Sequence, residues 1–259
     1  MPPPFTFAAY EDLCRAIVAA DLTVLPVMEA LASPLPARCI TLRYDIDGRP
    51  EHALVMARLL ARHGLRGTFY WHAAPPELFR VDLMRQVASL GHEIGYHYAA
   101  LAACGGDVEA AAARFMEEAG RFHAAGFAVR TAAAHGSRGY DNKALLRARP
   151  DLLAACGLTG EAYLGVDFAR VQYVSDAGWA WRRYPVRADA QEYRAEQGVR
   201  ALPCLSQTDL CTLIAACPLP LYLNTHPELW FASGLAARGY RWRRRIGECL
   251  LAREAARRL

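Results

Sequence analysis

The chain has 259 residues, of which 54% are hydrophobic and 22% charged, as in an ordinary globular protein with a sizeable core. Its formal charge is only +4, and Lys143 is the single lysine, so the basic residues do not predict a nucleic-acid-binding surface. No apolar run approaches the ~18 residues of a membrane span. The N-terminus lacks a secretory pattern and the eight cysteines form no CxxC pair, so a cytoplasmic location is expected.

The first half of the chain alternates predicted helices and strands, with glycines ending several of them. Helices are expected at Thr6–Ala20, Glu51–His63 and Asp82–Leu90, and from Asp107 to Gly126. Strands are expected at Ala37–Asp47, Gly67–His72, His92–His97 and Phe127–Ala134. This order is typical of repeated βαβ units around a parallel sheet.

The pattern is looser after Asn142. Short strands are predicted at Leu158–Tyr163, Val171–Ser175, Trp179–Tyr184 and Leu219–Thr225. Ser206 and Asp209 predict a capping box for a helix over Gln207–Ala216, and a terminal helix is expected over Arg241–Leu259. Because no repeat or low-complexity linker divides the chain, we interpret residues 1–259 as one domain, with the N-terminal and C-terminal helices packed on the sheet.

Two carboxylates follow the first strong strand. Asp45 and Asp47 are two residues apart in an extended segment, so both are expected on one side of the sheet. Close carboxylates repel unless a cation lies between them or their pKa values separate. The pair therefore suits a metal ligand beside a general base, although a polar turn before Gly48 explains it equally well.

The segment Gly91–His97 holds two histidines with different expected directions. Alternation along a strand puts Glu93, Gly95 and His97 on one face and His92 on the other, which argues against a shared ion. His97, at the end of the strand, is the better ligand candidate. Glu93 lies roughly 13 Å further back and is interpreted as a structural anion.

The other histidines separate by position. His52, His63 and His123 fall on predicted helices and are expected at the surface. His72, His135 and His226 fall at or just beyond predicted strand ends. His226 precedes Pro227 and is a candidate general acid, which Asp176 would orient; a simple turn residue is the alternative for Asp176.

Taken together, these motifs resemble the polysaccharide deacetylases, the NodB-homology or carbohydrate esterase family 4 group. Four segments carry the resemblance: Thr41–Gly48, Gly91–His97, Asp176 with Trp179, and Leu223–Pro227. The resemblance implies an α/β fold with a distorted (β/α) barrel, a divalent metal, usually zinc, and hydrolysis of N-acetyl groups on sugars. It further implies Asp45 as general base, Asp47 and His97 as metal ligands, and His226, tuned by Asp176, as general acid.

Two of the motifs depart from the family. The second motif expects a histidine four residues after His97, where this chain has Leu101, and the third expects an arginine within the segment Ala132–Ser137. We predict that His135 replaces the missing ligand, with His72 and His226 as weaker substitutes. Asp47, His97 and His135 would then form a three-ligand zinc site with room for water. The rival interpretation is a degenerate homologue that binds metal poorly.

The sequence thus predicts a metal-dependent hydrolase of an amide or N-acetyl bond on a small-molecule or lipid-linked amino-sugar precursor of a surface polysaccharide. The alternative is a non-enzymatic sugar-binding or assembly protein. Serine hydrolysis through Ser137 is a poor fit, because no Gly-x-Ser-x-Gly segment is present. The arginines beyond Arg241 are interpreted as a solvated face, with peripheral contact to anionic lipid or a substrate pyrophosphate as the alternative.

Overall fold

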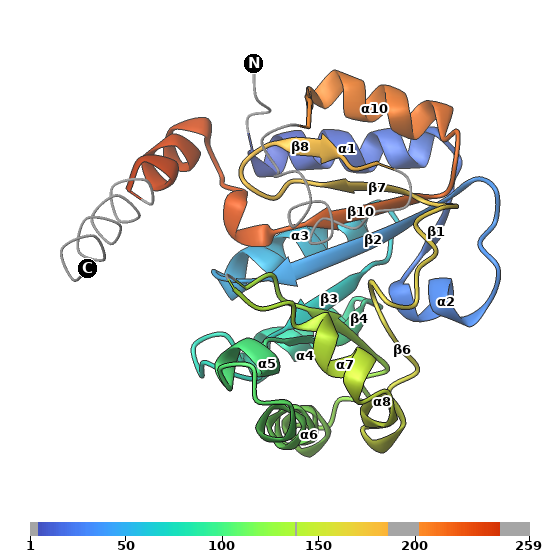
Figure 1. Cartoon of the computed structure of the whole chain (residues 1–259). Helices are drawn as coiled ribbons and strands as arrows, with labels where there is room; N and C mark the ends of the chain where they lie inside the picture. The colour runs from blue at the N-terminus through green and yellow to red at the C-terminus, as the bar shows by residue number, and fades with distance from the viewer. Residues whose placement is uncertain (1–4, 138, 186–201, 244–259) are drawn as a thin grey trace.

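The computed structural model describes residues 5–137, 139–185 and 202–243, and within them one large sheet organises the chain (Figure 1). Its hydrogen-bonded order is β6-β5-β4-β3-β2-β10-β7-β8-β9, with β1 paired to β2. Neighbouring strands run parallel except at the β7–β8 and β8–β9 pairs, which are antiparallel. The strands are β1 (Thr23–Leu25), β2 (Cys39–Ile46), β3 (Thr68–Trp71), β4 (Glu93–Tyr98), β5 (Thr131–Ala134), β6 (Gly160–Glu161), β7 (Gln172–Ser175), β8 (Trp181–Arg183), β9 (Cys204–Leu205) and β10 (Leu221–Thr225).

The mostly parallel α/β class expected from the sequence is therefore confirmed. Within the described residues no pairing joins β6 to β9, so the path of hydrogen-bonded strands is open. Closure into a distorted barrel of the deacetylase type stays a prediction.

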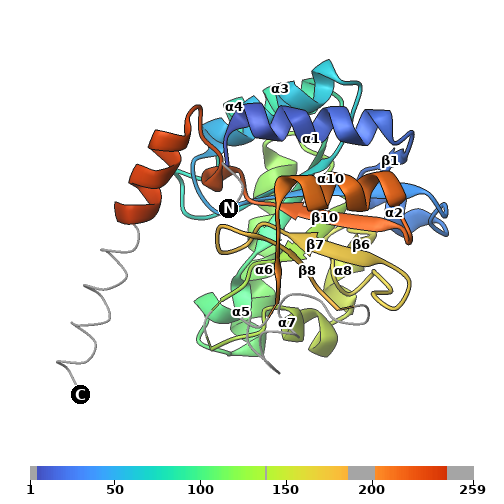
Figure 2. The same ribbon diagram turned by 90° about the horizontal axis from the view of Figure 1, so that it is seen from above.

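Helices pack around the sheet (Figure 1). They are α1 (Phe7–Ala19), α2 (Val27–Ala32), α3 (Pro50–Arg62), α4 (Val81–Ser89), α5 (Ala100–Ala103), α6 (Val108–Ala124), α7 (Lys143–Ala148), α8 (Asp151–Ala155), α10 (Gln207–Ala216) and the 3-10 turn η2 (Pro227–Leu229). Helices α1 and α10 lie side by side over β10 and β7, whereas α5 to α8 gather at the opposite edge (Figures 1 and 2).

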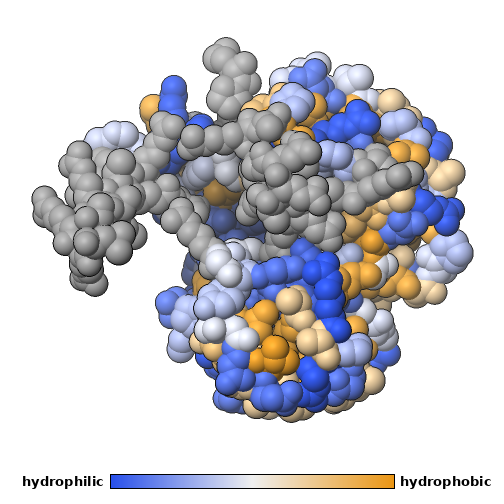
Figure 3. Space-filling model, viewed as in Figure 1, coloured by the Kyte–Doolittle hydropathy of each residue, from blue (hydrophilic) through white to orange (hydrophobic). Residues whose placement is uncertain are grey.

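Local chemistry explains the helix ends. Asp107 accepts hydrogen bonds from the backbone N–H groups of Glu109 and Ala110 at 3.0 Å, which satisfies two free donors at the start of α6. The predicted capping box of Ser206 and Asp209 is present at α10. On the face shown in Figure 3, hydrophilic residues surround a hydrophobic patch in the lower half of the view.

The long strand β2 lies at the centre of the sheet, and all eight of its residues are buried. Its apolar and β-branched residues are why the sequence predicted a strand here, and its buried polar side chains are Thr41, Arg43 and Asp45. The predicted strand at Phe127–Ala134 is shorter in the structure, and β1 and α2 were not predicted because they are short and partly exposed. The predicted helix over Arg241–Leu259 begins earlier, at residue 234, and residues 244–259 lie outside the described part.

No helix in the described part of the chain is both long and apolar enough to cross a membrane.

Candidate active site

The candidate residues lie at or just beyond the carboxyl ends of neighbouring strands. In the order β5, β4, β3, β2, β10 and β7, these ends supply His135, His97, His72, Asp45 with Asp47, His226 and Asp176. Polar side chains at this edge of a parallel sheet converge, because every strand points the same way there. The structure therefore brings all six predicted site residues together, and adds His72 as a full neighbour of the predicted metal ligands.

Asp47 and three histidines form a cluster that fits a divalent cation. The Nε2 atoms of His97, His72 and His135 lie 3.1, 3.6 and 3.7 Å from Oδ1 of Asp47. One donor atom from each of the four residues lies within 4.8 Å of all the others. Bonds of about 2.0–2.1 Å in tetrahedral geometry place donor atoms roughly 3.3 Å apart, so this spacing matches a metal site.

The protonation states of this cluster also suit a cation. Burial lowers the pKa of His72 and of His135, which favours neutral imidazoles. Burial alone would raise the pKa of Asp47, but hydrogen bonds from His72 and His97 hold it well below its ordinary value. Metal ligands must be deprotonated to bind, and the shifted pKa values of Asp47, His72 and His135 favour that state.

His97 is oriented by the neighbouring strand. Its Nδ1 lies 2.9 Å from the carbonyl oxygen of Ala133, which holds the ring so that Nε2 points toward Oδ1 of Asp47 at 3.1 Å. The side chain of His97 is 1% exposed, whereas those of Asp47 and His135 are 27% and 30% exposed. A ligand would therefore reach the cluster from the side of Asp47 and His135.

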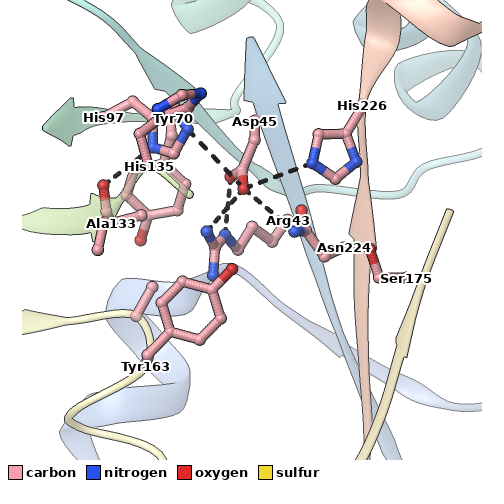
Figure 4. Close-up of polar contacts among 12 residues, drawn as sticks. Arg43, Asp45, Tyr70, His97, Ala133, His135, Tyr163, Ser175, Asn224 and His226 are labelled. Carbon is pink, nitrogen blue, oxygen red and sulfur yellow. Dashed lines mark hydrogen bonds and ion pairs between the residues drawn. The ribbon is translucent and has the colours of Figure 1, made fainter. Parts of the chain in front are cut away.

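Asp45 is held by an arginine that was not predicted as a site residue. Arg43, fully buried, donates from Nε and Nη2 to the two carboxylate oxygens of Asp45 at 2.8 and 2.7 Å (Figure 4). Asn224 donates to Oδ2 of the same carboxylate at 3.1 Å. Burial would raise the pKa of Asp45, but the Arg43 charge outweighs it and the pKa lies below its ordinary value.

Arg43 could have been found from the sequence. It precedes Asp45 by two residues, so alternation puts both side chains on the same face of β2. Its guanidinium lies 4.1 Å from the ring centre of Tyr163, which supports a cation in a buried position. Arg43 therefore holds Asp45 from two residues away on the same strand, β2.

On the other side of Asp45, His226 forms a pair with Asp176. Asp176 accepts a hydrogen bond from His226 Nδ1 at 2.6 Å, and Trp230 Nε1 donates to its second oxygen at 2.8 Å. Burial would lower the pKa of His226, but the Asp176 carboxylate raises it to about 10. The imidazole is therefore a protonated acid at neutral pH.

Asp45 lies between the cluster and this acid. Its Oδ2 is 4.0 Å from Nε2 of His97 and 4.0 Å from Nε2 of His226. Dashed lines mark the polar contacts of Asp45 in Figure 4. An ionised carboxylate, a protonated imidazole and a cluster that could hold a metal ion thus lie around one small volume.

Other predicted positions have structural roles. His92 faces away from the cluster and donates to the carbonyl of Ala57 at 2.9 Å, as strand alternation predicts. Glu93 accepts hydrogen bonds from the hydroxyls of Thr68 and Thr131 at the start of β4. His52 is not a solvated surface group as expected, because its ring packs between Phe7 and Phe231 at 5.4 and 5.3 Å.

Comparison with known proteins adds little to this geometry. No protein-family model and no curated protein sequence matches the chain. Among solved structures, the mannohexaose complex of Thermomonospora fusca beta-mannanase is similar over 78% of this chain and 76% of that one. The identity is 16% and the TM-score 0.32, so this likeness supports no conclusion on fold family or function.

Proposed function

We propose that the chain is a metal-dependent hydrolase of a C–N bond, of the deacetylase type, acting on an acylated amino sugar. The observation that carries the proposal is the position of Asp45, 4.0 Å from both His97 of the cluster and the acid His226. The proposed substrate is a small-molecule or lipid-linked precursor of a surface polysaccharide, and zinc is the first candidate for the cation.

Asp47, His72, His97 and His135 would hold a divalent cation, which would supply Lewis acidity toward a substrate carbonyl and a water at positions beyond these four ligands. Asp45 accepts a proton from the water that attacks the acyl carbon. Arg43 and Asn224 keep this carboxylate ionised and fix its direction.

His226 completes the reaction at the leaving nitrogen. The new C–O bond forms as the C–N bond breaks, and the amine takes a proton from Nε2 of His226. Asp176 fixes the ring through Nδ1 and stabilises its charge before transfer. The products are a carboxylic acid and a free amino sugar.

The test is a panel of N-acetyl and N-formyl amino sugars, with the released acid measured after the protein is loaded with zinc, cobalt or manganese. Asp45→Asn and His226→Gln are each expected to lower kcat roughly 100- to 10,000-fold. Asp12→Asn, at an exposed carboxylate on α1, is the matched control and keeps full activity.

Two results would overturn the proposal. One is sugar binding with no acid released by any metal-loaded sample, which favours the non-enzymatic sugar-binding protein. The other is activity that survives both Asp45→Asn and His226→Gln.

A further inference from the structure

A helix over residues 234–243 leaves the body of the molecule next to the candidate active site (Figures 1 and 2). It follows β10 and η2, whose junction carries His226. At its base the ring of Tyr240 lies 5.3 Å from that of Phe231, and the Arg49 guanidinium lies 4.4 Å from the ring centre of Tyr240. Arg49 follows Asp47 by two residues, so the helix is anchored beside the cluster of Asp47 and the three histidines.

Two large apolar side chains are strongly exposed on the outer face of this helix. Leu235 is 76% exposed and Trp242 66%, more than any other large hydrophobic side chain in the described part of the chain. Positions seven apart lie on the same side of a helix, and Arg238 lies on that side between them. The opposite side carries Ala237, which is 6% exposed and faces the body.

All the charged residues in the segment between Glu228 and Glu248 are basic. Between Glu228 and Glu248 the sequence contains no acidic residue, and it contains five arginines, at positions 238, 241, 243, 244 and 245. Helices that lie in a lipid interface typically combine exposed leucine and tryptophan with arginine. Tryptophan prefers the headgroup region, and each arginine near an anionic surface strengthens binding about fivefold.

Binding partners other than a lipid surface fit the face of Leu235, Arg238 and Trp242 less well. A tight interface with a second copy of the chain would bury Arg238 without an acidic partner from its own helix, which is costly. A free phosphate would leave Leu235 and Trp242 in water. A lipid surface satisfies both groups, because the side chain of Arg238 can extend to the phosphates while its apolar neighbours enter the interface.

We propose that helix 234–243 docks the protein on an anionic lipid surface through Leu235, Trp242 and Arg238. Because the helix begins beside the strand ends, docking places the cluster of Asp47 next to the membrane. This inference rests on exposure and charge, and holds whether or not the site is a hydrolase.

The fluorescence of Trp242 can report lipid binding directly. The other four tryptophans are at most 8% exposed, so a change in emission on vesicle binding reports Trp242. Phosphatidylcholine vesicles with phosphatidylglycerol should shift the emission to the blue, and lipids brominated in the acyl chain should quench it. Arg238 and Arg243 are exposed, so the protein should bind the anionic vesicles about 25-fold more strongly than vesicles of pure phosphatidylcholine. High salt should remove this difference.

A matched pair of variants isolates the surface. Leu235→Ser with Trp242→Ser should lower sedimentation with the anionic vesicles at least about tenfold. Val18→Ser with Met116→Ser removes exposed apolar side chains on α1 and α6 and should leave binding unchanged.

Three outcomes overturn the proposal. The first is no partitioning onto the anionic vesicles, and the second is an equal loss in both double variants. The third is a blue shift of Trp242 that depends on protein concentration without vesicles, which assigns the face to a second copy of the chain.

Discussion

The contact between Asp176 and His226 yields the sharpest prediction, tested by Asp176→Asn. The Asp176 side chain is fully buried, and it accepts hydrogen bonds from His226 Nδ1 at 2.6 Å, from the His226 backbone N–H at 3.0 Å and from Trp230 Nε1 at 2.8 Å. Asparagine has nearly the same shape but no charge. The substitution therefore removes the electrostatic support of the His226 imidazolium and keeps much of the packing.

The magnitude follows from the raised pKa. The Asp176 environment raises the pKa of His226 from 6.5 to about 10, which corresponds to roughly 5 kcal/mol in favour of the charged ring. Without the Asp176 charge, burial is the main influence left, and it lowers the pKa of a histidine. In Asp176→Asn the His226 pKa is expected below 6.5, so the acid is neutral at physiological pH and kcat falls.

The pH dependence of the free energy of unfolding follows from the same two pKa values. A raised folded-state pKa gives stability that is complete below pH 6.5 and is lost as pH rises toward about 10. The wild type should therefore be stabilised relative to Asp176→Asn below pH 6.5, and the two should approach each other above pH 10.

The assay is an NMR titration of histidine-labelled protein, with the His226 signal assigned from its absence in His226→Gln. Asp167→Asn changes an exposed carboxylate on another loop and serves as the control. The reasoning is refuted if His226 titrates near its ordinary value in the wild type, or if its pKa stays near 10 in Asp176→Asn.

Three further substitutions test separate parts of the site. His72→Ala should weaken metal binding at least about 10- to 100-fold, measured by competition with a chelating dye, because it removes a donor atom 3.6 Å from Asp47. Arg43→Met leaves the buried Asp45 carboxylate without its counter-ion and should lower the free energy of unfolding by about 3–5 kcal/mol in a urea titration. Gly95→Ala should cost about 1–3 kcal/mol in the same titration, since its Cβ would meet Tyr70 at 2.3 Å.

Two of these substitutions, His72→Ala and Gly95→Ala, have a matched control elsewhere in the chain. His123→Ala, at an exposed helix position, should leave metal affinity unchanged. Gly120→Ala in α6 meets no atom within 4 Å and should not destabilise the protein, because alanine favours a helix. Equal metal affinity in His72→Ala and His123→Ala would exclude His72 as a ligand, and unchanged stability in Arg43→Met would contradict the account of Asp45.

Much of the site could be predicted because strand ends are visible in the sequence. Asp47, His97, His135 and His226 each follow a short apolar run, and the structure places these ends together. His72 meets the same criterion, but the sequence does not show that β3 lies between β2 and β4 and so brings it equally close to Asp47. The order of strands depends on long-range packing, which local patterns do not contain.

Arg43 was overlooked for a different reason. An arginine in an apolar strand suggests an exposed face, and only its ion pair with Asp45 makes burial tolerable. The short elements β1 and α2 were missed because three and six residues, partly exposed, leave no clear periodic pattern.

The central claim is that Asp47 and its three histidine neighbours hold a divalent cation for hydrolysis. Its most direct test is equilibrium dialysis against zinc and cobalt. The number of metal ions bound per chain is then measured by elemental mass spectrometry. The account predicts one equivalent for the wild type and a loss of that equivalent in Asp47→Asn, with Asp12→Asn unchanged. A wild-type protein that retains neither metal, or an Asp47→Asn variant that retains the full equivalent, would contradict it.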